Sequence, residues 1–288
     1  MSAQKFETNA LHAGHDVTKT QGTRAVPIYL TSSYVFNDSN HAAKVFGLEE
    51  PGFIYTRLNN PTNDVLEQRL AVLEGGIGAV VTASGTAAIS TALLVLLKAG
   101  DHIVASSSLY GGTFNLLKDT LRRLGITTTF VDPSDAANFK NAVQENTRAF
   151  FVESLGNPKL DVLDLKAISN EAKVAKVPFI VDNTVATSYL VKPIEHGADI
   201  VIHSLTKYIS GNGTSLGGAI IVAGNFDWSN GKFPEFTEPS AGYHGLVYHQ
   251  ALGRAAFIAK VRIEGLRDFG AALSPFNGFQ IIQGLETL

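Results

Sequence analysis

The sequence predicts an α/β fold with a mostly parallel central sheet that carries helices on both faces. From residue 60 onward, short apolar segments alternate with segments of helical periodicity, and this order favours parallel strands joined by helices. Nearly half of the 288 residues are apolar and only 17% are charged, which suits a chain with a substantial core. Several helical segments also stop at glycine, the residue that most often ends a helix.

The first 60 residues differ from the rest of the chain. They are rich in Gly, Pro, Ser and Thr and show little periodicity, so we expect an extended arm over residues 1–60. The regular pattern begins at Pro61, a residue suited to the first turn of a helix. Apolar residues then recur at helical spacing up to Leu73, and Gly75 and Gly76 end this first helix.

The remaining elements are predicted from the same patterns. Residues 226–245 interrupt the alternation, and we expect a long irregular loop of the kind that often carries function. We expect strands at 78–82, 102–105, 127–131, 148–152, 178–181, 200–203 and 219–223. We expect further helices at 86–98, 114–124, 136–145, 165–175 (with Asp164 as N-cap) and 247–269.

Composition excludes several classes of function. The net charge is −3 without a basic stripe, which argues against a nucleic-acid partner. The absence of cysteine removes disulfides, thiolate nucleophiles and cysteine metal sites. The apolar stretch 87–97 is too short to cross a bilayer, and the N-terminus lacks the apolar core of a signal peptide, so we expect a cytoplasmic protein without a membrane partner. His12 and His15 lack further ligands nearby, and no metal site is expected.

Polar residues come directly after five of the predicted strands. In a parallel sheet, ligands bind beyond the carboxyl ends of the strands, so these residues are expected to surround one site. In chain order they are Ser84, Gly85 and Thr86; Tyr110; Glu153 and Asn157; Asp182 and Thr184; and Ser204, Thr206 and Lys207.

Each candidate has a plain structural alternative. Ser84-Gly85-Thr86 at a helix start is either a phosphate site or an ordinary N-cap. Asp182 either neutralises a cationic ring nitrogen or caps a turn. Tyr110 either stacks on a flat ring or fills a surface gap.

Lys207 is the residue whose role depends most on its neighbours. A lysine between an apolar strand and a glycine commonly extends to solvent, but a desolvated lysine has a lowered pKa and forms imines. The cofactor pyridoxal 5'-phosphate (PLP) requires such a lysine together with hydrogen-bond donors for its phosphate, an aromatic ring to stack on and an acid for its ring nitrogen. No G-x-G-x-x-G comes after the early strands, which argues against a nicotinamide-binding domain.

The segment Asp199–Gly213 resembles the PLP-attachment signature of the Cys/Met-metabolism family of PLP-dependent enzymes, a group of fold type I. Further segments resemble that family in the same order and at similar spacing, so the resemblance covers almost the whole chain. These segments are Tyr55-Thr-Arg57-Leu-Asn-Asn-Pro61-Thr62, Ser84-Gly85-Thr86, Tyr110-Gly-Gly-Thr113, Glu153-Ser-Leu-Gly-Asn157-Pro158 and Val181-Asp182-Asn183-Thr184.

The resemblance implies a role for each site residue. Lys207 would form the Schiff base with PLP, Asp182 would keep the pyridine nitrogen protonated, and Tyr110 would stack on the ring and act as an acid or base. The phosphate would be held by the amides of Gly85 and Thr86 and the hydroxyls of Ser204 and Thr206, with Tyr55 and Arg57 of a neighbouring subunit. Asn157 would lie near the ring oxygen and the substrate carboxylate, and Ser84 and Thr184 would also bind the cofactor.

Within the family, the chain resembles the O-acetylhomoserine sulfhydrylases. The residues that carry this likeness are Ser-Leu-Thr-Lys207, the segment 225–239, and Leu266-Arg-Asp-Phe-Gly270. The implied reaction is a γ-replacement in methionine biosynthesis that converts O-acetyl-L-homoserine and sulfide to L-homocysteine and acetate. A homodimer or homotetramer with shared active sites is implied as well.

The chain departs from the family pattern at two places. Thr86 stands where many relatives have Met or Gln, but a backbone amide serves the phosphate there. Relatives also continue past Leu288 into a second domain with a carboxylate-binding arginine. We therefore expect an arm (1–60), a PLP-binding domain (61–283) and the start of a further domain (284–288). Two alternatives remain open: a cystathionine γ-synthase or γ-lyase, and a PLP-binding fragment with weak catalysis or only a scaffolding role.

Overall fold

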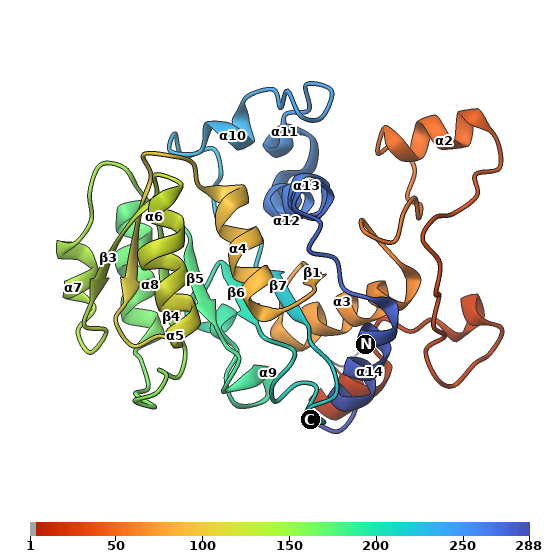
Figure 1. Ribbon diagram of the computed structural model, residues 1–288, viewed down its shortest axis with the longest axis horizontal. Helices are drawn as coiled ribbons and strands as arrows, with labels where there is room; N and C mark the ends of the chain where they lie inside the picture. The colour runs from red at the N-terminus through yellow and green to blue at the C-terminus, as the bar shows by residue number, and fades with distance from the viewer. Residues whose placement is uncertain (1–3) are drawn as a thin grey trace.

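The computed structural model describes residues 4–288 and confirms the predicted α/β architecture (Figure 1). Seven strands form one sheet in the order β1-β7-β6-β5-β4-β2-β3. Strands β6, β5, β4, β2 and β3 run parallel to one another, whereas β7 is antiparallel to both β1 and β6. The strands are β1 Gly78–Thr82, β2 His102–Ser106, β3 Thr127–Val131, β4 Thr147–Glu153, β5 Phe179–Asp182, β6 Ile200–His203 and β7 Gly218–Val222.

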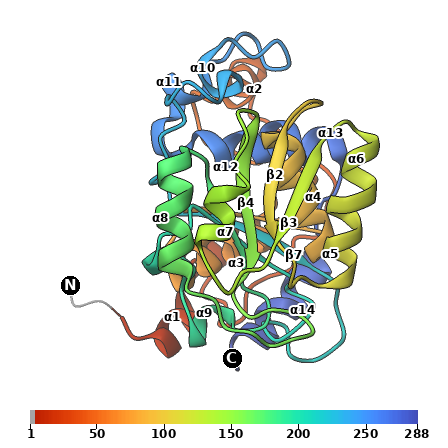
Figure 2. The same ribbon diagram turned by 90° about the vertical axis from the view of Figure 1, so that its left-hand side faces the viewer.

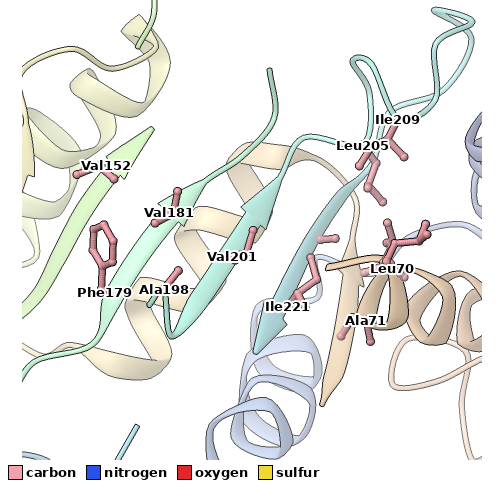
Figure 3. Close-up of a cluster of buried hydrophobic side chains, with 14 of the residues drawn as sticks. Leu70, Ala71, Val152, Phe179, Val181, Ala198, Val201, Leu205, Ile209 and Ile221 are labelled. Carbon is pink, nitrogen blue, oxygen red and sulfur yellow. The ribbon is translucent and has the colours of Figure 1, made fainter. Parts of the chain in front are cut away.

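Both faces of the sheet are covered, which explains why its strands are continuous apolar runs. Along β4, Phe150 and Val152 point into one core, and Ala149 and Phe151 point into the other. Figure 3 shows part of the first core: Phe179 and Val201 project from the sheet, and Leu70 and Ala71 project from the helix that begins at Pro61.

Helices form the two outer layers (Figure 2). No helix within residues 4–288 has both the length and the apolar character needed to span a membrane. The first core is covered by α3 Pro61–Glu74, α7 Ala137–Asn141, α8 Leu165–Ala175 and α14 Pro275–Leu285. The second core is covered by α4 Gly85–Leu96, by the run α5 Gly111–Asn115, η2 Leu116–Thr120 and α6 Leu121–Arg123, and by the run α12 Ala256–Lys260, η5 Val261–Leu266 and α13 Arg267–Phe269.

Side-chain caps define where the predicted helices begin. The Asn60 side chain accepts a hydrogen bond from the Thr62 amide at the start of α3, and Asp164 accepts one from the Ala167 amide at the start of α8. Such caps satisfy amides that have no partner within the helix. Gly75, in the left-handed region at φ 80°, ends α3 where expected.

The predicted helix over 247–269 is wrong as a single element. It is interrupted at Gly253, whose φ is +50°, so that α11 Tyr248–Leu252 and the short turn η4 Gly253–Ala255 precede α12. Glycine tolerates this backbone angle, whereas other residues rarely adopt it. Hydrophobic periodicity alone does not reveal such a change of direction.

Other elements differ from the prediction as well. The helix predicted over 86–98 ends at Leu96, and the helix predicted over 136–145 is limited to α7. The predicted arm contains the helices α1 Phe6–His12, η1 Val17–Thr20 and α2 Ser39–Phe46. The helix α14 and the short elements α9 Thr187–Leu190, η3 Pro193–His196 and α10 Pro234–Thr237 were not expected.

The irregular loop 226–245 is part of the second core. Trp228 is buried and stacks on Phe257, with 5.2 Å between ring centroids and 9° between their planes. Phe233 and Phe236 are buried against the same indole. The loop is therefore held against the second core by aromatic packing, and a functional role for it stays a prediction.

Replacing Phe150 with alanine is expected to lower the free energy of unfolding by about 3–5 kcal/mol, because the side chain is 0% exposed at the centre of the sheet. Val174→Ala on the outer face of α8, where the side chain is 74% exposed, should change it by less than about 0.5 kcal/mol. Urea unfolding of both variants checks this; equal effects would contradict the assignment of the core.

Candidate active site

A cavity of about 420 Å³ lies where the strands carry their carboxyl ends, as the sheet rule predicts. It gathers the predicted residues from five separate segments of the chain. Those that line it are Ser84, Gly85, Thr86, Tyr110, Asn157, Asp182, Thr184, Ser204, Thr206 and Lys207.

The N-terminus of α4 forms one end of the cavity. The Ser84 hydroxyl caps the helix by accepting a hydrogen bond from the Ala87 amide at 3.1 Å. The first amides of α4 have no partner within the helix and, with the helix dipole, suit a phosphate. A Cβ on Gly85 would lie 2.5 Å from Ser204 Cβ, so only glycine allows α4 to approach the end of β6 this closely. The N-cap and the candidate phosphate site are therefore one feature.

Asp182 ends β5 and is buried in the cavity wall. Its Oδ1 accepts hydrogen bonds from the amide (3.0 Å) and the hydroxyl (2.5 Å) of Thr184. Burial raises the pKa of Asp182, and the two bonds from Thr184 oppose that rise because they stabilise the carboxylate. The Thr184 hydroxyl also accepts from the Ser204 amide at 2.8 Å, which ties the ends of β5 and β6 together.

Tyr110 stands at the start of α5 with its ring over Gly112. A Cβ on Gly112 would lie 2.5 Å from Tyr110 Cε1, which accounts for a glycine at this position of the motif. The side chain is 54% exposed, and it lines the cavity. The Tyr110 amide donates to Glu153 Oε1 at 2.6 Å, so a carboxyl from β4 fixes the backbone that carries the ring.

Lys207 lines the cavity and is exposed, so of the two alternatives for this residue the single chain shows extension to solvent. Its backbone is held by its amide, which donates to the Ser204 carbonyl at 3.2 Å, and by its carbonyl, which accepts from the Gly211 amide at 2.8 Å. The hydroxyl of Thr206 donates to the Gly217 carbonyl at 3.2 Å, and this single hydrogen cannot serve a phosphate at the same time.

Tyr55 and Arg57 do not line this cavity. They border a separate open hollow together with Ser274, and the Arg57 guanidinium lies 5.4 Å from the centroid of the Tyr55 ring. Arg57 also donates to the carbonyl of Arg267. Within one chain, the structure therefore does not bring these two residues to the other candidates.

Glu153 is a residue of the cavity to which the sequence assigned no role. It is the last residue of β4, after a buried apolar run, and is only 5% exposed. Burial and the neighbouring Asp182 raise its pKa to about 8. The only signal for it in the sequence is its position at a strand end, which it shares with the residues that were assigned.

A second group of polar side chains, which we did not predict from the sequence, lies on the face of the sheet opposite the cavity. Glu74, at the end of α3, accepts hydrogen bonds on Oε1 from His203 Nε2 at 2.9 Å and from Asn183 Nδ2 at 3.1 Å. Asn183 Oδ1 in turn accepts from the Ser154 hydroxyl at 2.7 Å. All four side chains are buried, and together they fix the ends of β4, β5 and β6 from the face opposite the cavity.

The cavity fits PLP by the chemistry of its donors. Helix amides at one end suit a phosphate, a buried carboxylate suits a cationic ring nitrogen, and an amine suits an aldehyde. No group of three or more His, Cys, Asp or Glu side chains within the described range 4–288 could hold a metal ion. A family model for Cys/Met metabolism PLP-dependent enzymes matches residues 7–288, and the chain belongs to this family.

Particular relatives share both sequence and structure. An O-acetyl-L-homoserine sulfhydrylase from Leptospira meyeri is 57% identical over 99% of this chain. A crystal structure of a putative O-acetylhomoserine (thiol)-lyase from Campylobacter jejuni, which holds N'-pyridoxyl-lysine-5'-monophosphate, superposes with a TM-score of 0.95 at 42% identity, over 99% of this chain and 71% of that one. A cystathionine γ-lyase from Lactobacillus plantarum, complexed with L-serine, gives a TM-score of 0.80 at 30% identity, over 99% and 64%.

These comparisons also define how much of a relative the chain represents. The chain spans 66% of the length of the Leptospira meyeri protein, or about two thirds. The family, its fold and its cofactor class are therefore shared over the chain, while the activity of the longer relatives belongs to those proteins.

Gly85→Ala is expected to weaken PLP binding by at least about tenfold, because the added Cβ meets Ser204 and moves the α4 amides out of place; one lost hydrogen bond to a charged group is worth about 1.5–3 kcal/mol. Gly111→Ala is the matched control, since it is also the first residue of a helix and its Cβ would meet nothing within 4 Å. Absorbance titration with PLP measures both variants. Equal affinities would contradict the close-approach argument.

Proposed function

We propose that the chain serves a PLP-dependent γ-replacement that converts O-acetyl-L-homoserine and sulfide to L-homocysteine and acetate. The observation that carries the proposal is the cavity, which collects the amine of Lys207, the carboxyl of Asp182 and the N-terminus of α4 around one space. The family assignment and the likeness to O-acetylhomoserine sulfhydrylases support the choice of substrate.

Different residues of the cavity bind different parts of the cofactor. PLP, when bound, supplies an electron sink for carbanion chemistry. The amides at the start of α4 bind its phosphate, and the Asp182 carboxylate holds a proton on the ring nitrogen. The ring of Tyr110, fixed at the start of α5, forms one face of the binding slot and its hydroxyl is available for proton transfer.

The amine of Lys207 is the base in this proposal. It lies in the cavity and is exposed, so it is able to take a proton from the substrate Cα and return one to the carbon chain. The C–O bond at Cγ breaks, acetate leaves, and the C–S bond forms with sulfide. Asn157, which also lines the cavity, is placed to orient the ring oxygen or the substrate carboxylate.

A γ-lyase or a cystathionine γ-synthase would use the same cavity. The likeness to the cystathionine γ-lyase is weaker than that to the (thiol)-lyase, both in identity and in TM-score, which favours the γ-replacement with sulfide. An assay that offers sulfide and cysteine as alternative nucleophiles separates these reactions. We also propose that the protein acts in the cytoplasm as a homodimer or homotetramer.

Borohydride reduction of the PLP-loaded protein should attach the cofactor to Lys207, because the amine of this lysine lies in the wall of the cavity. Lys207→Ala should lower turnover by about 10³-fold or more, since the base is lost. Peptide mapping locates the label and a homocysteine assay measures turnover. A label on another lysine, or full turnover in the variant, would overturn the proposal; Lys166→Ala on α8 is the control.

The proposed sharing of Tyr55 and Arg57 between subunits is tested by complementation. Arg57→Ala and Lys207→Ala should each be inactive alone, but mixed dimers should contain one intact site. With random 1:1 assembly, half the dimers are mixed and each has one of two sites intact, so about a quarter of wild-type activity should return. No recovery after verified subunit exchange would show that Arg57 acts within its own chain.

A further inference from the structure

Two carboxyl groups stand side by side in the wall of the cavity. Glu153 and Asp182 are register partners on the parallel strands β4 and β5, and residues paired in this way point to the same face of a sheet. Both line the cavity and both are buried. Two adjacent buried carboxyl groups do not easily ionise together, because the like charges repel in a medium that screens them poorly.

The hydrogen bonds around the pair are unequal. Asp182 receives two donors, the amide and the hydroxyl of Thr184, both on Oδ1. Glu153 receives one, the Tyr110 amide, on Oε1. Because donors stabilise an ionised carboxylate, the negative charge belongs on Asp182 and the proton belongs on Glu153. The single bond to Glu153 remains possible in the neutral acid, whose carbonyl oxygen is still an acceptor.

We propose that Glu153 is a positioning residue that stays protonated in the working site, so that Asp182 is the anion of the pair and Tyr110 keeps its anchor. The inference rests on the proposed PLP function, because Asp182 matters as an anion only where a cationic ring nitrogen must be held. A charged Glu153 would add a second negative group beside a cofactor that is itself anionic, and would weaken its binding.

The surrounding charges agree with this assignment. Burial first, then the charge of Asp182, raises the pKa of Glu153 to about 8, and Asp161 from the loop after β4 acts in the same direction. Burial also raises the pKa of Asp182, but the two hydrogen bonds from Thr184 and, to a smaller degree, the charge of His203 on β6 oppose that rise, and Glu153 has no such donor pair. Lys207 is the cation that lines the same cavity. Glu153 is therefore neutral below about pH 8 and ionises above it.

The test compares PLP affinity of the wild-type chain and Glu153→Gln across pH. The amide keeps an acceptor for the Tyr110 N–H and imitates the neutral acid. If only the neutral form binds well, a group with a pKa of about 8 is roughly nine-tenths neutral at pH 7 and one-tenth neutral at pH 9, so the wild-type Kd should rise about tenfold relative to that of the variant. At pH 7 the two affinities should agree within about threefold.

Glu235→Gln is the matched control. Burial raises the pKa of Glu235 as well, but this residue does not line the cavity, so its replacement should leave the pH dependence of PLP binding unchanged. Glu153→Met, also uncharged, provides a second variant if the amide fails to fold, and the same rise relative to it is expected.

The outcomes are separable. A Kd ratio between wild type and Glu153→Gln that does not change from pH 7 to pH 9 overturns the inference and leaves the PLP function standing. A loss of affinity in Glu153→Gln at pH 7 of about tenfold or more also overturns it, because it would show that Glu153 works as an anion. A wild-type chain that binds no PLP at any pH defeats the proposed function itself.

Discussion

The hydrogen bonds of Glu74 fix the edge of the sheet on which the whole site depends. One buried carboxylate at the end of α3 binds His203 on β6 and Asn183 after β5, and Asn183 extends the group to Ser154 after β4. Each of these polar groups would cost about 1–3 kcal/mol if it were left buried without a partner. The three strand ends therefore keep a fixed relation from behind, while their alternate residues face the cavity.

At the strand ends, side chains on one face of the sheet support the structure, and side chains on the other face line the cavity. Because side chains alternate along a strand, Asp182 and Asn183 are adjacent in sequence but lie on opposite faces. Asn183 joins the supporting group, and Asp182 enters the cavity. Thr184 then turns back and binds both Asp182 and the Ser204 amide, so the supporting and the functional groups are linked through a single backbone turn.

The sequence predicted the sheet well and the site in part, for physical reasons. Strands buried on both faces appear as apolar runs, and the polar residues at their ends mark the cavity, which is why Asp182 and Lys207 were found together. The break at Gly253 was missed because apolar periodicity continues across it. Glu153 was found at a strand end in the same way but received no role, because its burial beside Asp182 depends on the β4–β5 register.

The distribution of charge in the cavity likewise depends on which hydrogen-bond donors the fold brings to each carboxyl group. Two carboxyl groups in equivalent positions differ because one has a threonine two residues later that bonds back to it, and the other accepts a lone amide from a different segment. A residue-by-residue comparison would treat both as acids at a strand end. Their hydrogen-bond donors separate them, giving one the character of a counter-ion and the other that of a neutral anchor for Tyr110.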